Sequence, residues 1–223
     1  MKTFFTLFTL IIGVLIITSC NTNTSCPEMI DKGDLFYTQK TLEAMPDINK
    51  SFVVFKDKMG QELLFNIIDA GDTIKHGRFA GSCETNPGQR VYLNYQKKNR
   101  TVRFENDSLH SPIFIWIDTE LDFGAYNEYD VIKVSIPMAD SENYQYVKIM
   151  TDSRRVSDDQ VAKINSLLIH DSEIEILGKT FTDTYHLKNH NPNNSHLIYY
   201  NFEIGLVSFT DQSGKTWVFD RYE

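Results

Sequence analysis

The stretch Val53-Val54-Phe55-Lys56-Asp57-Lys58-Met59-Gly60-Gln61-Glu62-Leu63 indicates the fold class, because it has the composition of a β-hairpin. Apolar, β-branched and aromatic residues flank an Asp-Lys-Met-Gly segment that favours a turn. The same pattern, V-x-F-x-D-x-x-G-x-x-apolar, returns at Val207-Ser208-Phe209-Thr210-Asp211-Gln212-Ser213-Gly214-Lys215-Thr216-Trp217. We therefore predict two hairpins of one geometry, at residues 51–68 and near the C-terminus. An alternative is a domain made of two related β halves.

Further short runs of apolar residues between and beside these hairpins predict more strands. They fall at residues 90–96, 101–105, 113–118, 130–136, 144–150, 174–177, 180–187, 197–203, 205–210 and 216–219. Several alternate apolar and polar residues with the two-residue period of a half-buried strand. The polar residues 97–100 predict a turn between the first two runs, and Gly205 predicts a bulge or a close backbone approach.

One segment predicts a helix, at about residues 157–169. Ser157 and Gln160 have the spacing of a capping box, and Val161, Ile164 and Leu168 follow at helical spacing. We therefore expect a mainly β (α+β) domain over residues 30–223. It would be a strongly curved antiparallel sheet, or a half-open barrel, with this one helix packed on it.

The N-terminal residues have the features of a signal peptide. Lys2 precedes an apolar segment, residues 4–17, that is short for a membrane span and ends in Ile17-Thr18-Ser19-Cys20. This tetrapeptide resembles the lipobox of bacterial lipoproteins. The resemblance implies that residues 1–19 are removed, that Cys20 carries the lipid anchor and that residues 20–29 form a tether. The alternative is an ordinary secretory signal with a chance cysteine.

The lipobox resemblance also implies a location. Asn21 follows the anchor, and by the sorting rule of Gram-negative lipoproteins this implies delivery to the outer membrane. The leaflet stays open, and the lack of an acidic cluster directly after Cys20 favours a domain that faces the periplasm over a surface-exposed one. Residues 178–217 resemble a β-meander found near the end of many envelope lipoproteins of unknown function. That second resemblance implies a fold family and no activity.

The charge balance limits the partners. Thirty acidic residues stand against 22 basic ones, a formal net charge of −8, which argues against nucleic acid as a partner and against a basic patch that docks on anionic lipid. The expected contact with the membrane is therefore the lipid on Cys20. Of the three cysteines, Cys26 and Cys83 are then left to form a disulfide in an oxidising compartment, and two unpaired thiols are the alternative.

The sequence contains no recognisable catalytic or cofactor-binding motif. His186, His190 and His196 have a side chain that zinc prefers, but their Asn-rich context with Pro192 indicates a solvated connection between strands. We expect no metal site, no cofactor and no catalytic residues, because no nucleophile elbow, phosphate-binding loop or zinc motif is present.

The best candidate for ligand binding is the acidic and aromatic stretch of residues 118–130, which we interpret as one loop. Its proposed ligand-binding residues are Phe123, Tyr126, Tyr129, Asp122 and Glu128, since rings stack on sugars and carboxylates accept hydrogen bonds from sugar hydroxyls. The alternative is a solvated acidic loop held by buried rings.

We therefore expect a non-enzymatic binding or assembly role in the cell envelope, with a protein or glycan as partner. The alternatives are a half-barrel carrier of an acyl chain and a hydrolase without a recognisable motif. A dry, apolar cavity would favour the carrier, a filled interior with an exposed aromatic patch the binding module, and a cleft with convergent acids or histidines the enzyme.

Overall fold

A computed structural model describes residues 28–83, 88–109, 112–122, 127–137, 144–153, 168–187 and 198–223. The chain divides into two compact units, one of residues 1–31 with 78–94 and one of residues 32–77 with 95–223. In the first unit, the Tyr92 amide donates to the Glu28 carbonyl at 2.9 Å, and the Arg78 guanidinium lies 4.2 Å from the centre of the Tyr92 ring. The second unit contains most of the described chain and the candidate site.

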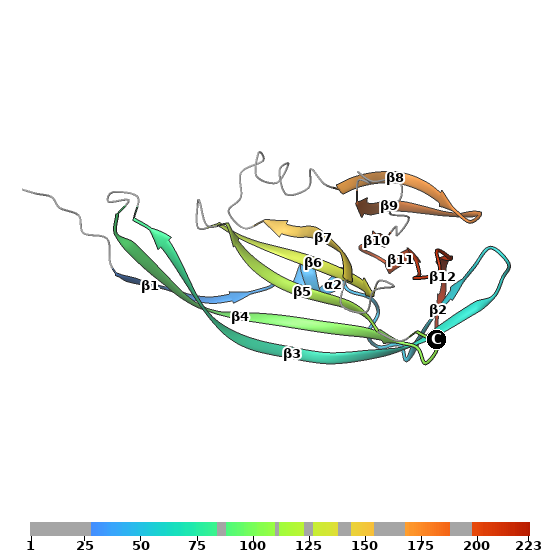
Figure 1. Ribbon diagram of the computed structural model, residues 1–223, viewed down its shortest axis with the longest axis horizontal. Coiled ribbons are helices and arrows are strands. Elements are labelled where there is room, and N and C mark those ends of the chain that lie inside the picture. The colour runs from blue at the N-terminus through green and yellow to red at the C-terminus, as the bar shows by residue number, and fades with distance from the viewer. Residues whose placement is uncertain are drawn as a thin grey trace, which may run out of the picture. The chain divides into compact units, whose positions relative to one another are not determined.

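The described residues are mainly β-strands (Figure 1). The elements are β1 (Met29–Phe36), α2 (Gln39–Glu43), β2 (Phe52–Lys56), β3 (Glu62–Ser82), β4 (Arg90–Glu105), β5 (Ile113–Asp122), β6 (Asn127–Pro137), β7 (Tyr144–Ser153), β8 (Leu168–Ile176), β9 (Lys179–Leu187), β10 (Ile198–Asn201), β11 (Gly205–Thr210) and β12 (Thr216–Tyr222). They form one sheet in the order β7-β6-β5-β4-β3-β2-β12-β11-β10-β9-β8, with β1 paired to β4. The prediction of a mainly β fold with a strongly curved antiparallel sheet is confirmed.

The sheet of the second unit curves around a single apolar core and is nearly closed. Strands from both ends of the order contribute to that core, and β7 comes into contact with β9. Phe55 of β2 lies at its centre, with edge-to-face contacts to Phe65 at 5.7 Å and Phe209 at 5.2 Å between ring centroids. Such contacts favour tight packing of aromatic rings. The interior is therefore filled with side chains from at least nine strands.

Both predicted hairpins are confirmed, and their turns have the same hydrogen bonds. Oδ1 of Asp57 accepts from the amides of Met59 and Gln61, and Oδ1 of Asp211 accepts from those of Ser213 and Lys215, at 2.7 to 3.0 Å. Each turn ends in a glycine at positive φ. The turns also bind each other, because Lys215 Nζ lies 2.7 Å from the buried Asp57 Oδ2.

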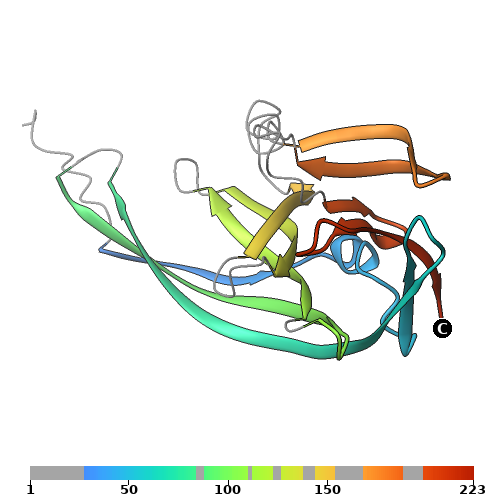
Figure 2. The same cartoon turned by 45° about the vertical axis from the view of Figure 1, so that its right-hand side comes forward.

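The helix of the described chain, α2, lies between two parts of the sheet (Figure 2). Thr38 is its N-cap, and the Tyr200 hydroxyl of β10 donates to the Ala44 carbonyl at 2.7 Å. On the other side, the fully buried Asp130 of β6 accepts from the Thr38 amide at 2.7 Å and from the Thr41 hydroxyl at 3.0 Å. A short helix thus connects strands that are far apart in the sheet order.

Two details of the predicted elements are wrong, and a third, the helix, is tested only at its last two residues. Residues 97–100 do not form a turn, because β4 runs through them and their charges pair with carboxylates: Lys97 with Asp118 and Lys98 with Asp72, both at 2.7 Å. Residues 118–130 are not one loop, since β5 continues to Asp122 and β6 begins at Asn127. The predicted helix lies outside the described residues up to 167, and its last two residues, 168 and 169, belong to β8.

The predicted special role of Gly205 is confirmed and gives a testable stability effect. Gly205 has φ +91°, and a Cβ there would lie 3.2 Å from the Pro46 Cα and 3.0 Å from its Cγ. Gly205→Ala should lower the free energy of unfolding by about 2 to 3 kcal/mol, from backbone strain and crowding together. Thermal unfolding followed by circular dichroism measures this loss.

The matched control for Gly205 is Gly178→Ala. Gly178 has φ +81° with open space around its Cα, so alanine there adds only the cost of the backbone conformation, about 1 kcal/mol. Equal losses in the two variants would contradict the close approach of Pro46.

Candidate functional site

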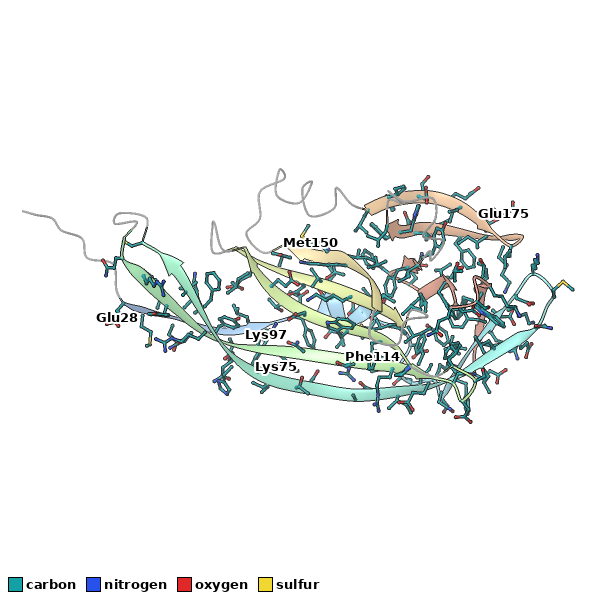
Figure 3. The ribbon with its side chains drawn as sticks, in the orientation of Figure 1. Glu28, Lys75, Lys97, Phe114, Met150 and Glu175 are labelled. Carbon is teal, nitrogen blue, oxygen red and sulfur yellow. The ribbon has the colours of Figure 1, made fainter. Side chains whose placement is uncertain are left out.

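An open pocket of about 800 Å³ lies on the face of β3 to β7 that is turned away from the core. The residues that line it all come from the outward-facing positions of these strands. They are Thr73, Lys75, Asn99, Thr101, Phe114, Trp116, Glu120, Lys133, Ser135 and Lys148. Figure 3 labels Lys75 on β3 and Phe114 on β5. All ten belong to the second unit.

Strand alternation produces this arrangement. In β5, Ile113, Ile115 and Ile117 are fully buried in the core, so Phe114 and Trp116 point to the opposite face, where they are half-buried. The antiparallel register then aligns outward residues from four strands. Thr101 is opposite Trp116, Trp116 opposite Lys133, and Lys133 opposite Lys148.

A network of ion pairs continues along this face. Lys133 Nζ lies 3.0 Å from Asp118 Oδ2 and 2.7 Å from Glu120 Oε1, and Lys97 Nζ lies 2.7 Å from Asp118 Oδ1. Lys148 binds the other oxygen of Glu120, which also accepts from the Tyr129 hydroxyl at 2.9 Å. Three lysines therefore share two carboxylates.

The charged form of Glu120 is strongly favoured. Burial raises the pKa of Glu120, but hydrogen bonds from Lys133 and Lys148 outweigh it and lower that pKa to about 2. Burial likewise lowers the pKa of Lys133, and its contacts with Glu120 and Asp118 more than compensate, so the pKa is raised. Glu120 is thus an anion at neutral pH and a poor general acid, which needs a pKa near the working pH.

Three groups in the pocket have unused binding capacity. Lys75 is exposed and makes no ion pair within the described chain. Asn99 is only 8% exposed, and its Oδ1 has no hydrogen-bond partner in the part of the molecule that the structure describes. Trp116 presents an aromatic surface on β5, the strand next to that of Asn99. A ligand with a ring, hydroxyl groups and a charge would find a partner for each feature here.

The sequence-predicted binding residues lie elsewhere or are not described. Tyr129 is buried at 7% exposure, with its hydroxyl on Glu120 and the Lys148 Nζ 5.3 Å from its ring centre. Glu128 is half-buried in β6 and Asp122 is the last residue of β5. Phe123 and Tyr126 lie outside the described residues. Tyr129 therefore supports Glu120 at the edge of the pocket, and binding by the other four stays a prediction.

The histidines predicted as weak metal candidates are only partly described. His186 lies in β9, where its Nε2 is 3.0 Å from Asp171 Oδ2 and its Nδ1 is 3.1 Å from the Leu187 carbonyl. His190 and His196 lie outside the described residues. Within the described ranges, no group of three or more acidic, histidine or cysteine side chains is arranged to hold a metal ion.

Cys83 is the one cysteine within the described residues, where it is 2% exposed and disulfide-bonded. Its predicted partner Cys26 and the predicted lipid anchor Cys20 both lie outside them, so the Cys26–Cys83 pairing stays a prediction. We expect the chain to gain two mass units on reduction and to yield a Cys26–Cys83 peptide pair after proteolysis. A Cys83 peptide linked to Cys20, or a free Cys83 thiol, would contradict the pairing.

Sequence reasoning missed this pocket because its residues are dispersed. Trp116, Lys133 and Lys148 are far apart in the chain and meet only through the strand register. The available signal was the row of polar and aromatic residues on the outward positions of neighbouring strands.

The chain has no match among protein-family models, curated proteins or solved structures. In the described part of the chain, no helix has the length and apolar character required to span a membrane.

Proposed function

We propose that this protein is a lipid-anchored lipoprotein of the cell envelope with a non-enzymatic binding role. The pocket over β3 to β7 is its binding site, and a saccharide is the class of ligand that suits the lining. The signal peptide, the lipid on Cys20 and the periplasmic location are part of this proposal and derive from the lipobox resemblance. The main observation in support of a binding role is the open pocket around Trp116.

The pocket supports a saccharide by its mixture of groups. Sugar rings have an apolar face that stacks on indole, and Trp116 and Phe114 provide aromatic surface side by side on β5. Sugar hydroxyls need donors and acceptors, which Asn99, Thr101 and Ser135 supply. A volume of about 800 Å³ fits the range of small-molecule sites and exceeds the needs of a single sugar ring.

The filled interior favours this function over the acyl-chain carrier. The inward side chains of β2 to β7 and β10 to β12 pack into one apolar core. The low pKa of Glu120 weighs against a glycosidase at this pocket, because such an enzyme needs one protonated carboxyl group.

The test is binding of the full chain, kept in detergent, to an array of bacterial envelope polysaccharide fragments. We expect binding to at least one fragment class and a loss of at least tenfold in Trp116→Ala, since a stacked aromatic contributes about 1.4 kcal/mol or more. Leu64→Ala is the matched control, because Leu64 is exposed on β3 and outside the pocket. An array without binding, or equal binding by Trp116→Ala, would overturn the proposal.

A further inference from the structure

The pocket has a charge opposite to that of the chain. Lys75, Lys133 and Lys148 line it with Glu120 as the one carboxylate among the lining residues, and the adjoining Lys97 and Asp118 cancel each other. The pocket thus has two more positive than negative groups, whereas the whole chain has a net charge of −8. A local excess of that sign attracts anions.

Two lysines of the pocket, Lys133 and Lys148, repel each other, and a bound anion would reduce this repulsion. Lys133 and Lys148 are directly opposite each other on β6 and β7, an arrangement that is unfavourable for like charges. They share Glu120, and Lys148 has Glu120 as its one ion-pair partner within the described residues. Lys133 also contacts Asp118 at 3.0 Å, so a second negative group in the pocket would mainly give Lys148 a further partner.

Lys75 supplies the remaining positive charge from another strand. It lines the pocket from β3, is exposed and forms no ion pair with any described residue. Lys97, the neighbouring lysine on this face, is already paired with Asp118 at 2.7 Å. Lys75 is therefore the lysine of the pocket that is most available to a ligand.

We propose that the pocket selects an acidic saccharide, a sugar ring that carries a carboxylate or a phosphate. The ring stacks on Trp116, the hydroxyls meet Asn99, Thr101 and Ser135, and the acidic group binds Lys75, while Lys133 and Lys148 add to the positive charge of the pocket. This inference rests on the proposed saccharide-binding function and adds the charge of the ligand.

The test compares three probes by isothermal titration calorimetry with the full chain in a neutral detergent. They are a glucuronate-containing trisaccharide, a neutral glucose trisaccharide and glucose 1-phosphate. We expect at least one acidic probe to bind about tenfold more tightly than the neutral one at low salt, and the difference to shrink as salt is added. The stronger of the two acidic probes identifies the acidic group as carboxylate or phosphate.

Two lysine variants test the preference for an acidic ligand separately from saccharide binding as such. Lys75→Gln should weaken binding of the acidic probe about fivefold and leave the neutral probe unchanged, because an exposed ion pair contributes up to about 1 kcal/mol. Lys50→Gln, at an exposed position away from the pocket, is the control. Equal binding of acidic and neutral probes, or equal effects of the two lysine variants, would overturn the acidic preference alone. Absence of binding by all three probes would overturn the saccharide function as well.

Discussion

Replacing Asp130 by alanine should lower the free energy of unfolding by about 3 to 5 kcal/mol, the largest loss we expect from a single substitution. Asp130 is fully buried and its carboxylate accepts from the Thr38 amide, the Thr41 hydroxyl and the Thr119 hydroxyl at 2.7 to 3.0 Å. Alanine would remove the shared acceptor of these three donors, of which the Thr41 hydroxyl keeps Thr151 as a partner at 2.8 Å. The midpoint of thermal unfolding should fall by about 10 °C or more.

Asp130 matters because it holds the helix that connects two parts of the sheet. The carboxylate binds both the N-cap residue of α2 and Thr41 in its first turn, and negative charge is favourable at this end of a helix. Asp130→Asn keeps the shape and one acceptor, so it should cost clearly less than alanine. Asp107→Ala is the matched control, since Asp107 is exposed and should change stability by less than about 0.5 kcal/mol. A loss at Asp130 no larger than at Asp107 would contradict this role.

Replacing Glu120 by glutamine should remove a stabilisation that depends on pH. The pKa of Glu120 is lowered from 4.5 to about 2 in the folded chain. A lowered pKa means that the ionised group stabilises the fold above pH 4.5 and that this contribution disappears as the pH falls toward 2. The shift corresponds to at most about 3 kcal/mol.

Chemical denaturation of the wild type and of Glu120→Gln between pH 7 and pH 2.5 measures this effect. The two stabilities should differ most at neutral pH and converge below pH 4. Lys148→Gln, which removes one of the two lysines on Glu120, should show a smaller version of the same change. A difference between wild type and Glu120→Gln that is equal at pH 7 and pH 2.5 would show that the ion pairs do not hold this carboxylate.

Local features of the fold could be predicted from the sequence. The hairpins depend on neighbouring strands and on turn residues such as Asp57 and Gly60, so a short window contains all of their information. Gly205 was predictable for the same reason, because a glycine after an aromatic run indicates special backbone geometry. The contact of Gly205 with Pro46 could not be predicted, since it joins segments far apart in the chain.

Features that depend on cross-strand pairing could not be predicted. The polar residues 97–100 have the composition of a turn, and only the carboxylates on neighbouring strands explain why they continue a strand. The helix α2 has five residues, too few for a helical period to be visible in the sequence. The pocket also depends on the register that places Trp116, Lys133 and Lys148 in one row.

The most direct test of the account is a crystal structure of the chain soaked with the acidic saccharide that binds best. We expect ligand density on the outward face of β3 to β7, with the sugar ring over the Trp116 indole and its acidic group within hydrogen-bond distance of Lys75. Ligand density inside the curved sheet, among Phe55, Phe65 and Phe209, would contradict the account and favour a carrier instead.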